Sequence, residues 1–209
     1  FDLNADLQRS FVQTYFPTAF LRTMFFDDFR HNDLECAFSE FINFEKKNER
    51  PQFVYAHLYL PHPPFTYDAE GNHIQDTYAE NRFDSILKDA YLQQTIFTNK
   101  KAIELVDSIQ KRDSNAVIIM MSDHGSRLGV DWYDPTEMDY YRALNNFSAF
   151  YFPGHEGDIR EKIAAVNTYR VLFNTYFNTD YEILEDRQMW YVPELPWDQT
   201  DVTEKLLKN

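Results

Sequence analysis

The sequence predicts an α/β fold, in which a mixed or largely parallel sheet is flanked by helices. Helical stripes of apolar residues and short runs of β-forming residues alternate along the chain, which is the order typical of this class. The predicted strands are residues 53–60 (FVYAHLYL), 116–121 (AVIIMM) and 147–152 (FSAFYF). An average sheet has about five or six strands, so the predicted sheet is incomplete.

Residues 1–50 predict a helical N-terminal segment, and residues 51–209 a separate α/β part. The aromatic-rich beginning of the chain is interrupted at Pro17, which cannot continue a helix interior. The second half of the segment has helical spacing of its apolar residues, namely Leu34, Phe38, Phe41 and Ile42.

Pro51 marks the change to the first predicted strand, which is dense in aromatic and aliphatic residues. Residues 61–73 (PHPPFTYDAEGNH) predict a loop, because prolines in such close succession continue neither a helix nor a central strand. Residues 78–112 return to helical periodicity with a possible break near Tyr91. The predicted apolar stripe consists of Phe83, Ile86, Leu87, Ala90, Leu92, Ile96, Ile103, Val106 and Ile109.

The second half of the chain predicts a loop, a helical stretch and a short strand. Residues 127–146 (RLGVDWYDPTEMDYYRALNN) predict a long polar loop between two strands, a place where functional residues often gather. Residues 158–177 predict a final amphipathic helix or helix pair. Residues 188–197 (QMWYVPELPW) predict a short strand that leads into a proline-limited tail.

Composition limits the possible functions. With 209 residues, 44% apolar and 17% aromatic, the chain can bury a substantial core. Thirty-four acidic against 20 basic residues give a net charge of −14, which disfavours nucleic acid and anionic lipid as partners, although it is also typical of simple solubility. No apolar run is long enough to span a membrane. The single cysteine, Cys36, excludes an internal disulfide and a cysteine-rich zinc site.

Polar residues follow two of the predicted strands. His57 and His62 belong to VYAHLYLPHPPF, and Asp123 and His124 to IIMMSDHG. Ligands of parallel sheets bind beyond the carboxyl ends of the strands, so these side chains can converge on one crevice. Imidazole and carboxylate together suit zinc or manganese. Gly125 would let the chain turn sharply and approach a bound group closely.

Each of these residues also has a structural interpretation. Asp123 and His124 could simply cap the segment after their strand. His57 alternates with apolar neighbours, which favours a hydrogen-bonded core histidine. His62 is the better site candidate, because the surrounding prolines restrict its backbone. The remaining histidines lie in polar stretches and are expected at the surface, namely His31, His73 and His155.

Four blocks of sequence, taken in order, resemble the C-terminal half of bacterial sulfatase-like hydrolases and transferases of the alkaline phosphatase superfamily. They are PQFVYAHLYLPHPPFTYDAEGN, YLQQTIFTNKKAIELVDSI, VIIMMSDHGSR and VNTYRVLFNTYF, and the resemblance covers roughly residues 50–180. The branch they resemble includes lipoteichoic acid synthases and phosphoethanolamine transferases. This resemblance implies an alkaline-phosphatase-like α/β fold.

The resemblance also implies roles for individual residues. Asp123 and His124 match the Asp-His pair of the family that binds metal. His62 resembles the histidine that faces the phosphoryl group or leaving group, and His57 matches less well. Arg142 resembles a recurrent arginine before the next strand, although a surface salt bridge explains it equally well. Two further matching residues, in VNTYR, are expected to tie the last helix to the sheet, namely Asn167 and Arg170.

The chain departs from the family pattern in its first 50 residues. The family's Ser or Thr nucleophile and another acidic ligand come from the N-terminal half, and nothing in residues 1–50 resembles that segment. The threonines there lie in a helix-like stretch, at Thr14, Thr18 and Thr23. The sulfatase pattern Cys/Ser-x-Pro-x-Arg is absent around Cys36. We therefore expect no catalytic nucleophile in this chain, and no activity from it alone.

The leading hypothesis is a fragment of a phosphoryl or sulfuryl ester hydrolase or transferase that uses zinc or manganese. The resemblance implies lipid head groups or surface glycan esters as substrates, and the N-terminal half of the same protein as a partner. It further implies a membrane-anchored, extracytoplasmic enzyme whose membrane segments are absent here. Two alternatives remain: a non-catalytic α/β interaction module with a remnant metal pair, and a true sulfatase with an upstream Cys-x-Pro-x-Arg.

Overall fold

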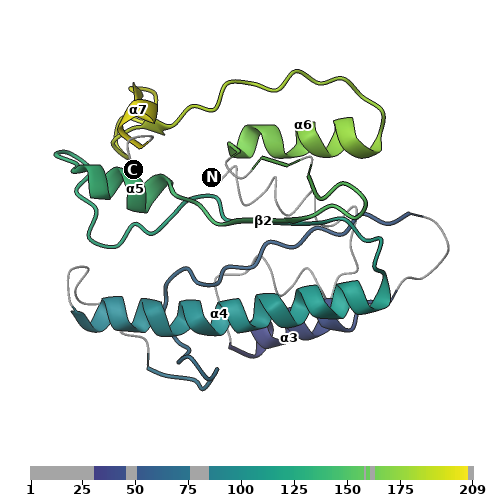
Figure 1. Ribbon diagram of the computed structural model, residues 1–209. Coiled ribbons are helices and arrows are strands. Elements are labelled where there is room, and N and C mark those ends of the chain that lie inside the picture. Colours follow the sequence, from purple (N-terminus) through teal and green to yellow (C-terminus); the bar gives the residue numbers. More distant parts are fainter. Residues whose placement is uncertain (1–30, 46–50, 76–84, 158, 161–162, 207–209) are drawn as a thin grey trace, which may run out of the picture. The chain divides into compact units, whose positions relative to one another are not determined.

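A computed structural model describes most of the chain after residue 30 (Figure 1). The described residues are 31–45, 51–75, 85–157, 159–160 and 163–206. The chain divides into two compact units, Phe1–Arg112 and Asp113–Asn209, and each is described by itself. The predictions for residues 1–30, and for a domain boundary near residue 50, fall outside the described residues. Within them, no helix is both long and apolar enough to cross a membrane.

The first unit has two described helices, which pack together with buried residues of the loop before the second helix, among them Phe65 and Tyr67. The two helices are α3 (His31–Ile42) and α4 (Ser85–Arg112), which lie side by side in Figure 1. The end of α4 supplies donors to the carbonyls at the end of α3: Ser108 Oγ donates to the Ile42 carbonyl at 2.8 Å, and the Arg112 guanidinium bonds the same carbonyl. Carbonyls of the last helical turn have no partner within their own helix, so these bonds and the positive charge stabilise the end of α3.

One face of α4 is buried. The buried residues follow one another at intervals of three, four or eight positions, which keeps them on the same side of the helix. They are Leu87, Ala90, Gln94, Phe97 and Leu105. The helix runs continuously through Tyr91, so the predicted break does not occur. The predicted stripe mixed two faces of the helix, because Ile86, Leu92 and Ile103 are exposed. Apolar residues on opposite faces satisfy the same helical spacing, and only packing separates them.

The first predicted strand is absent from the structure. Residues 53–59 have no regular secondary structure, and the Phe53 side chain is 77% exposed. A β-strand is stabilised by hydrogen bonds to a neighbouring strand, and no described residue pairs with this segment. The prediction of a buried strand over residues 53–60 is therefore wrong for the structure as described, although the following loop, residues 61–73, is confirmed.

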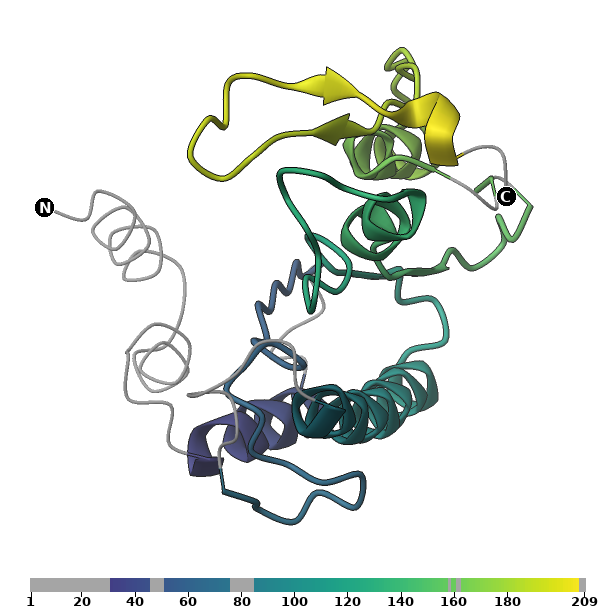
Figure 2. The ribbon, with the colours of Figure 1, turned by 90° about the vertical axis from the view of Figure 1, so that its left-hand side faces the viewer.

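The second unit holds two small antiparallel sheets. In one, β1 (Ile118–Met121) pairs with β2 (Ser148–Tyr151), in a register that places Ile118 opposite Tyr151. In the other, β3 (Met189–Trp190) pairs with β4 (Thr200–Asp201), as Figure 2 shows. The predicted strands within residues 116–121, 147–152 and 188–197 are confirmed. Both pairings among the described residues are antiparallel, so a largely parallel sheet stays a prediction.

The predicted polar loop of residues 127–146 contains a helix, α5 (Glu137–Leu144). The chain continues into α6 (Ala165–Tyr176), which confirms the last predicted helix, and ends with α7 (Thr203–Leu206) in what was predicted to be a tail. The core of this unit joins α5 to the second sheet, through Val130, Tyr140, Ala143, Trp190 and Val202. The rings of Trp132 and Trp190 stack there, with their centroids 4.8 Å apart.

Asn167 and Arg170 join α6 to an extended segment and not to the sheet. The fully buried Asn167 amide donates to the Leu184 carbonyl and accepts from the Leu184 N–H, both at 2.9 Å. Arg170 donates to the Glu182 carbonyl at 2.9 Å. The two residues do have the predicted structural role, but they bind the segment before β3 and not the sheet. That segment forms no strand, so its backbone N–H and C=O groups are free to bond side chains.

Candidate metal centre

The turn that carries Asp123 and His124 begins at the end of β1, and Ser122 fixes it to the beginning of β2. The Ser122 N–H donates to the Phe147 carbonyl at 2.9 Å, and the Phe147 N–H donates to Ser122 Oγ at 2.8 Å. Asn146 Nδ2 donates to the Ser122 carbonyl at 3.1 Å. The N–H, the carbonyl and the hydroxyl oxygen of Ser122 thus all take part in anchoring the turn.

Gly125 packs this turn against the end of α5. Its N–H donates to the Ala143 carbonyl at 2.9 Å. A Cβ at this position would lie 2.8 Å from the Asn145 carbonyl oxygen and would overlap the Arg142 carbonyl oxygen even more closely. The structure therefore gives Gly125 a packing role, and its approach to a bound group stays a prediction. The close approach that excludes a side chain is made to the backbone of α5.

A capping box begins α5 and so holds the helix that supports the turn. The Asp139 carboxylate accepts hydrogen bonds from Thr136 N at 2.9 Å and Thr136 Oγ1 at 2.7 Å. In return, the Asp139 N–H donates to Thr136 Oγ1 at 3.3 Å. These bonds satisfy groups that the first helical turn leaves unpaired. The hydrogen bonds from Thr136 hold the pKa of Asp139 below its ordinary value of 3.8, with a smaller contribution from the charge of Arg142.

Replacing Asp139 with alanine is expected to lower the free energy of unfolding by about 0.5–2 kcal/mol at pH 7. Because folding depresses the pKa of Asp139, its contribution is present above pH 3.8 and is lost as the pH falls through the folded value. The difference between wild type and Asp139→Ala should therefore shrink below pH 3.8. Chemical denaturation of both proteins at several pH values measures this difference in the free energy of unfolding. Glu137→Ala, in the same turn but outside the capping box, serves as the control, and an equal loss in both variants would contradict the assignment.

Asp123 and His124 point their polar atoms toward each other. His124 Nε2 lies 3.6 Å from Asp123 Oδ2, and the two side chains are 28% and 84% exposed. His124 Nδ1 lies 2.6 Å from the Gly125 carbonyl oxygen. A carbonyl only accepts, so Nδ1 carries the proton of the neutral ring and Nε2 keeps its lone pair. Histidines that bind metals show this arrangement, with the second ring nitrogen bonded to a carbonyl or carboxylate.

The pair fits one part of a metal site. Two ligand atoms at about 2.0–2.2 Å from a tetrahedral zinc ion lie roughly 3.3–3.5 Å apart, close to the separation of the two atoms here. A complete site needs at least three protein ligands. Among the residues that the structure describes, no group of three or more His, Cys, Asp or Glu side chains could hold a metal ion.

His62 and His57 lie in the first unit, on the chain before α4. His62 Nδ1 lies 2.6 Å from the Pro63 carbonyl oxygen, so this ring too carries its proton on Nδ1 and presents Nε2 with a lone pair. The edge of the ring contacts Tyr59, with centroids 5.0 Å apart. His57 is exposed and contacts the same tyrosine at 5.7 Å. The expectation of a core histidine at position 57 is wrong, because the segment around it is not a buried strand.

Arg142 lies in the last turn of α5, and its side chain is exposed. Its backbone carbonyl contacts Gly125, so Arg142 belongs to the same local structure as Asp123 and His124. The convergence of these residues with His57 and His62 stays a prediction, because the two histidines belong to the other unit. Sequence reasoning missed the supporting residues Ser122 and Thr136. The second had a readable signal, since Thr-x-x-Asp is a form of the capping box.

Comparison with known proteins gives one match. The model of a protein family described as Sulfatase matches residues 10–193. The match includes both units and extends beyond the range of the resemblance found in the sequence. No curated protein and no solved structure matches the chain.

Proposed function

Because the chain belongs to the sulfatase family of the alkaline phosphatase superfamily, we propose that it is part of a metal-dependent enzyme that hydrolyses or transfers phosphate or sulfate esters of lipid head groups or surface glycans. The family comprises enzymes that hydrolyse or transfer sulfate or phosphate esters, generally with a divalent metal ion. The lipoteichoic acid synthase and phosphoethanolamine transferase branch is the proposed position of the chain within it.

The observation that carries the proposal is the arrangement of Asp123 and His124. The two side chains place an oxygen and an unprotonated nitrogen side by side after β1, and the Gly125 carbonyl holds the histidine ring in the tautomer needed for metal binding. A surface pair with only a capping role has no need of this tautomer. The proposed metal is zinc or manganese, since both accept carboxylate and imidazole ligands.

The proposed division of roles follows from the chemistry of each side chain. Asp123 and His124 hold the metal, which when bound polarises the ester and activates a hydroxyl nucleophile. His62 is proposed to face the phosphoryl group or leaving group through Nε2, whose lone pair can accept a proton from a reacting hydroxyl. The exposed Arg142 guanidinium can bind ester oxygens through paired hydrogen bonds. His57 is a weaker candidate for the same substrate contacts.

The nucleophile and the further metal ligands are proposed to come from the N-terminal half of the same protein. Thr14, Thr18 and Thr23 lie outside the described residues. Cys36 lies in ECAFSE, without the Cys-x-Pro-x-Arg pattern of formylglycine sulfatases. The whole protein is proposed to act on the outer side of a bacterial cytoplasmic membrane, anchored by segments that are not in this chain.

The 209-residue chain alone is expected to bind zinc or manganese weakly and to hydrolyse no phosphodiester. Two ligands give an incomplete coordination sphere, and no covalent intermediate forms without a nucleophile. The measurement is the release of nitrophenol from a nitrophenyl phosphodiester and from the matching sulfate ester, with each metal supplied in turn. Turnover by the purified chain, free of any other polypeptide, would show that this proposal is wrong.

The second candidate is a non-catalytic interaction module with a remnant metal pair. Two observations favour the interaction module. The Asp123 side chain is 84% exposed, and no group of three or more possible ligands lies among the described side chains. The two candidates differ in the effect of Asp123→Ala in the cell. An enzyme would lose its function with this substitution, whereas an interaction module would tolerate it. A Cys-x-Pro-x-Arg encoded before Phe1 would instead favour a true sulfatase.

A further inference from the structure

Gln94 is a polar residue in the middle of the buried face of α4. Its side chain is fully buried, between the apolar positions Ala90 and Phe97. A buried amide is costly unless all its hydrogen-bonding groups find partners. Its position on the helix therefore requires partners from another segment of the chain.

The proline-rich loop before α4 supplies all of these partners. Gln94 Oε1 accepts from the Thr66 N–H at 2.8 Å and from the Tyr67 N–H at 3.3 Å. Gln94 Nε2 donates to the His62 carbonyl at 3.0 Å and to the Pro64 carbonyl at 3.3 Å. One side chain thus uses both its donors and its acceptor on the backbone of the loop that carries His62.

The loop depends on such a side chain, because Pro61, Pro63 and Pro64 have no N–H and cannot form a regular backbone ladder. Among uncharged side chains, only an amide supplies two donors and a separate acceptor oxygen. Glutamate lacks the donors when ionised, and methionine lacks both functions.

The bonds of Gln94 lie on both sides of the group that orients the His62 ring. The ring is held by the Pro63 carbonyl, and Gln94 fixes the carbonyls of the residues immediately before and after Pro63. Movement of this stretch would move the acceptor of His62 Nδ1. The direction of Nε2, and the tautomer that leaves it unprotonated, would then no longer be fixed.

We infer that Gln94 is the positioning residue for His62, through which α4 fixes the imidazole that faces the ester. The inference rests on the proposed function for the role of His62, while the link between Gln94 and the His62 ring rests on the geometry alone. Gln94 touches no substrate, so its effect on the reaction passes through the loop.

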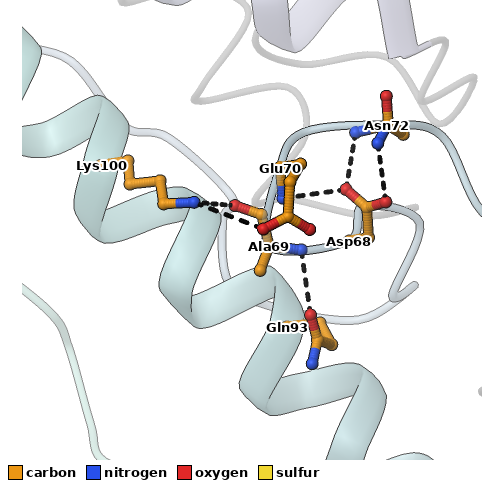
Figure 3. A network of polar contacts seen from close by, with 6 residues as sticks. All are labelled: Asp68, Ala69, Glu70, Asn72, Gln93 and Lys100. Atoms are coloured by element: carbon orange, nitrogen blue, oxygen red, sulfur yellow. Dashed lines mark hydrogen bonds and ion pairs between the residues drawn. The ribbon is translucent and has the colours of Figure 1, made fainter.

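The neighbouring loop contacts provide a matched control, shown in Figure 3. Gln93, the residue before Gln94 on α4, accepts a single bond from the Ala69 N–H at 3.1 Å, and Lys100 donates to the Ala69 carbonyl at 2.6 Å. The hydrogen bonds that the structure describes for these two side chains go to the later part of the loop, at Ala69, and Lys100 also lies 3.7 Å from the Glu70 carboxylate. Gln93→Met therefore removes a loop bond of the same chemical kind without touching the backbone around His62.

The first measurement is amide hydrogen exchange of Gln94→Met and Gln93→Met. In Gln94→Met the Thr66 and Tyr67 amides should exchange about 10- to 100-fold faster than in wild type, because they lose their acceptor. In Gln93→Met these two amides should keep their wild-type rates, and only the Ala69 amide should accelerate. Wild-type exchange rates at Thr66 and Tyr67 in Gln94→Met would overturn the inference.

The second measurement covers the case in which Gln94→Met does not fold. Nitrogen NMR at pH 8 should show a single His62 tautomer in wild type, protonated at Nδ1. Gln94→Glu retains the acceptor for Thr66 but loses both donors, so its His62 ring should populate both tautomers. A mixed tautomer in wild type, or an unchanged single tautomer in Gln94→Glu, would overturn the inference.

The third measurement is turnover of a phosphate ester by the intact protein. Gln94→Glu should lower kcat about 10- to 100-fold with a much smaller change in KM, since a misplaced catalytic group costs rate more than binding. Gln93→Met should keep the wild-type kcat. If His62→Ala also keeps the wild-type kcat, the proposed role of His62 is wrong, and the NMR result still decides whether Gln94 positions the ring.

Discussion

Gly125→Ala is expected to lower the free energy of unfolding of the second unit by about 3 kcal/mol or more, because the new methyl group would overlap backbone atoms that cannot move aside cheaply. The added Cβ would meet the carbonyl oxygens of Arg142 and Asn145. It would also force apart the hydrogen bond from Gly125 N–H to the Ala143 carbonyl. In thermal denaturation, the expected fall in Tm is roughly 6–12 °C for a chain of this size.

The matched control is Gly157→Ala, in the same unit. A Cβ at Gly157 meets no heavy atom within 4 Å, and no positive φ makes alanine unfavourable there. This substitution should leave Tm nearly unchanged. Equal Tm values for Gly125→Ala and wild type would show that the turn after β1 does not pack on α5 as the structure has it.

Asp123→Asn and His124→Gln are expected to lower kcat of the intact protein by about 10³-fold or more, because each would remove a proposed ligand of the metal that activates the nucleophile. Asparagine keeps the size of aspartate but loses its charge, so it remains a poor metal ligand. Both side chains are at least partly exposed, and the substitutions should change Tm little. The two variants should therefore lose activity while keeping a Tm close to that of wild type.

Asp198→Asn serves as the control for Asp123→Asn, since it removes an exposed carboxylate from the same unit. It should keep full activity. If Asp123→Asn keeps wild-type activity as well, Asp123 is not a ligand of a catalytic metal. A non-catalytic interaction module would then explain the chain better.

The parts of the fold that the sequence predicts are those with a strong local pattern. The runs AVIIMM and FSAFYF form β1 and β2 because each is apolar and flanked by polar residues. The helix in residues 137–144 was missed because its neighbours, Gly129 and Pro135, suggest a loop. Its capping box, Thr136 to Asp139, was the stronger signal.

Residues 53–60 show the limit of local pattern. The segment has the composition of a buried strand, yet a strand forms only when another strand offers its backbone, and no described residue does so. The same limit applies to the site. The Asp-His pair could be found by its spacing, whereas the close contact of Gly125 with the backbone of α5 and the bonds from Gln94 to residues 27 to 32 positions away depend on tertiary structure.

Asp123 and His124 are proposed to bind a divalent metal in the intact enzyme. The most direct measurement is the zinc and manganese content of the intact protein, compared with Asp123→Asn and Asp198→Asn after dialysis against equal free metal. The proposal predicts that wild type and Asp198→Asn retain bound metal, and that Asp123→Asn loses it or binds it at least about 10-fold more weakly. Equal metal content and affinity in all three proteins would contradict the claim.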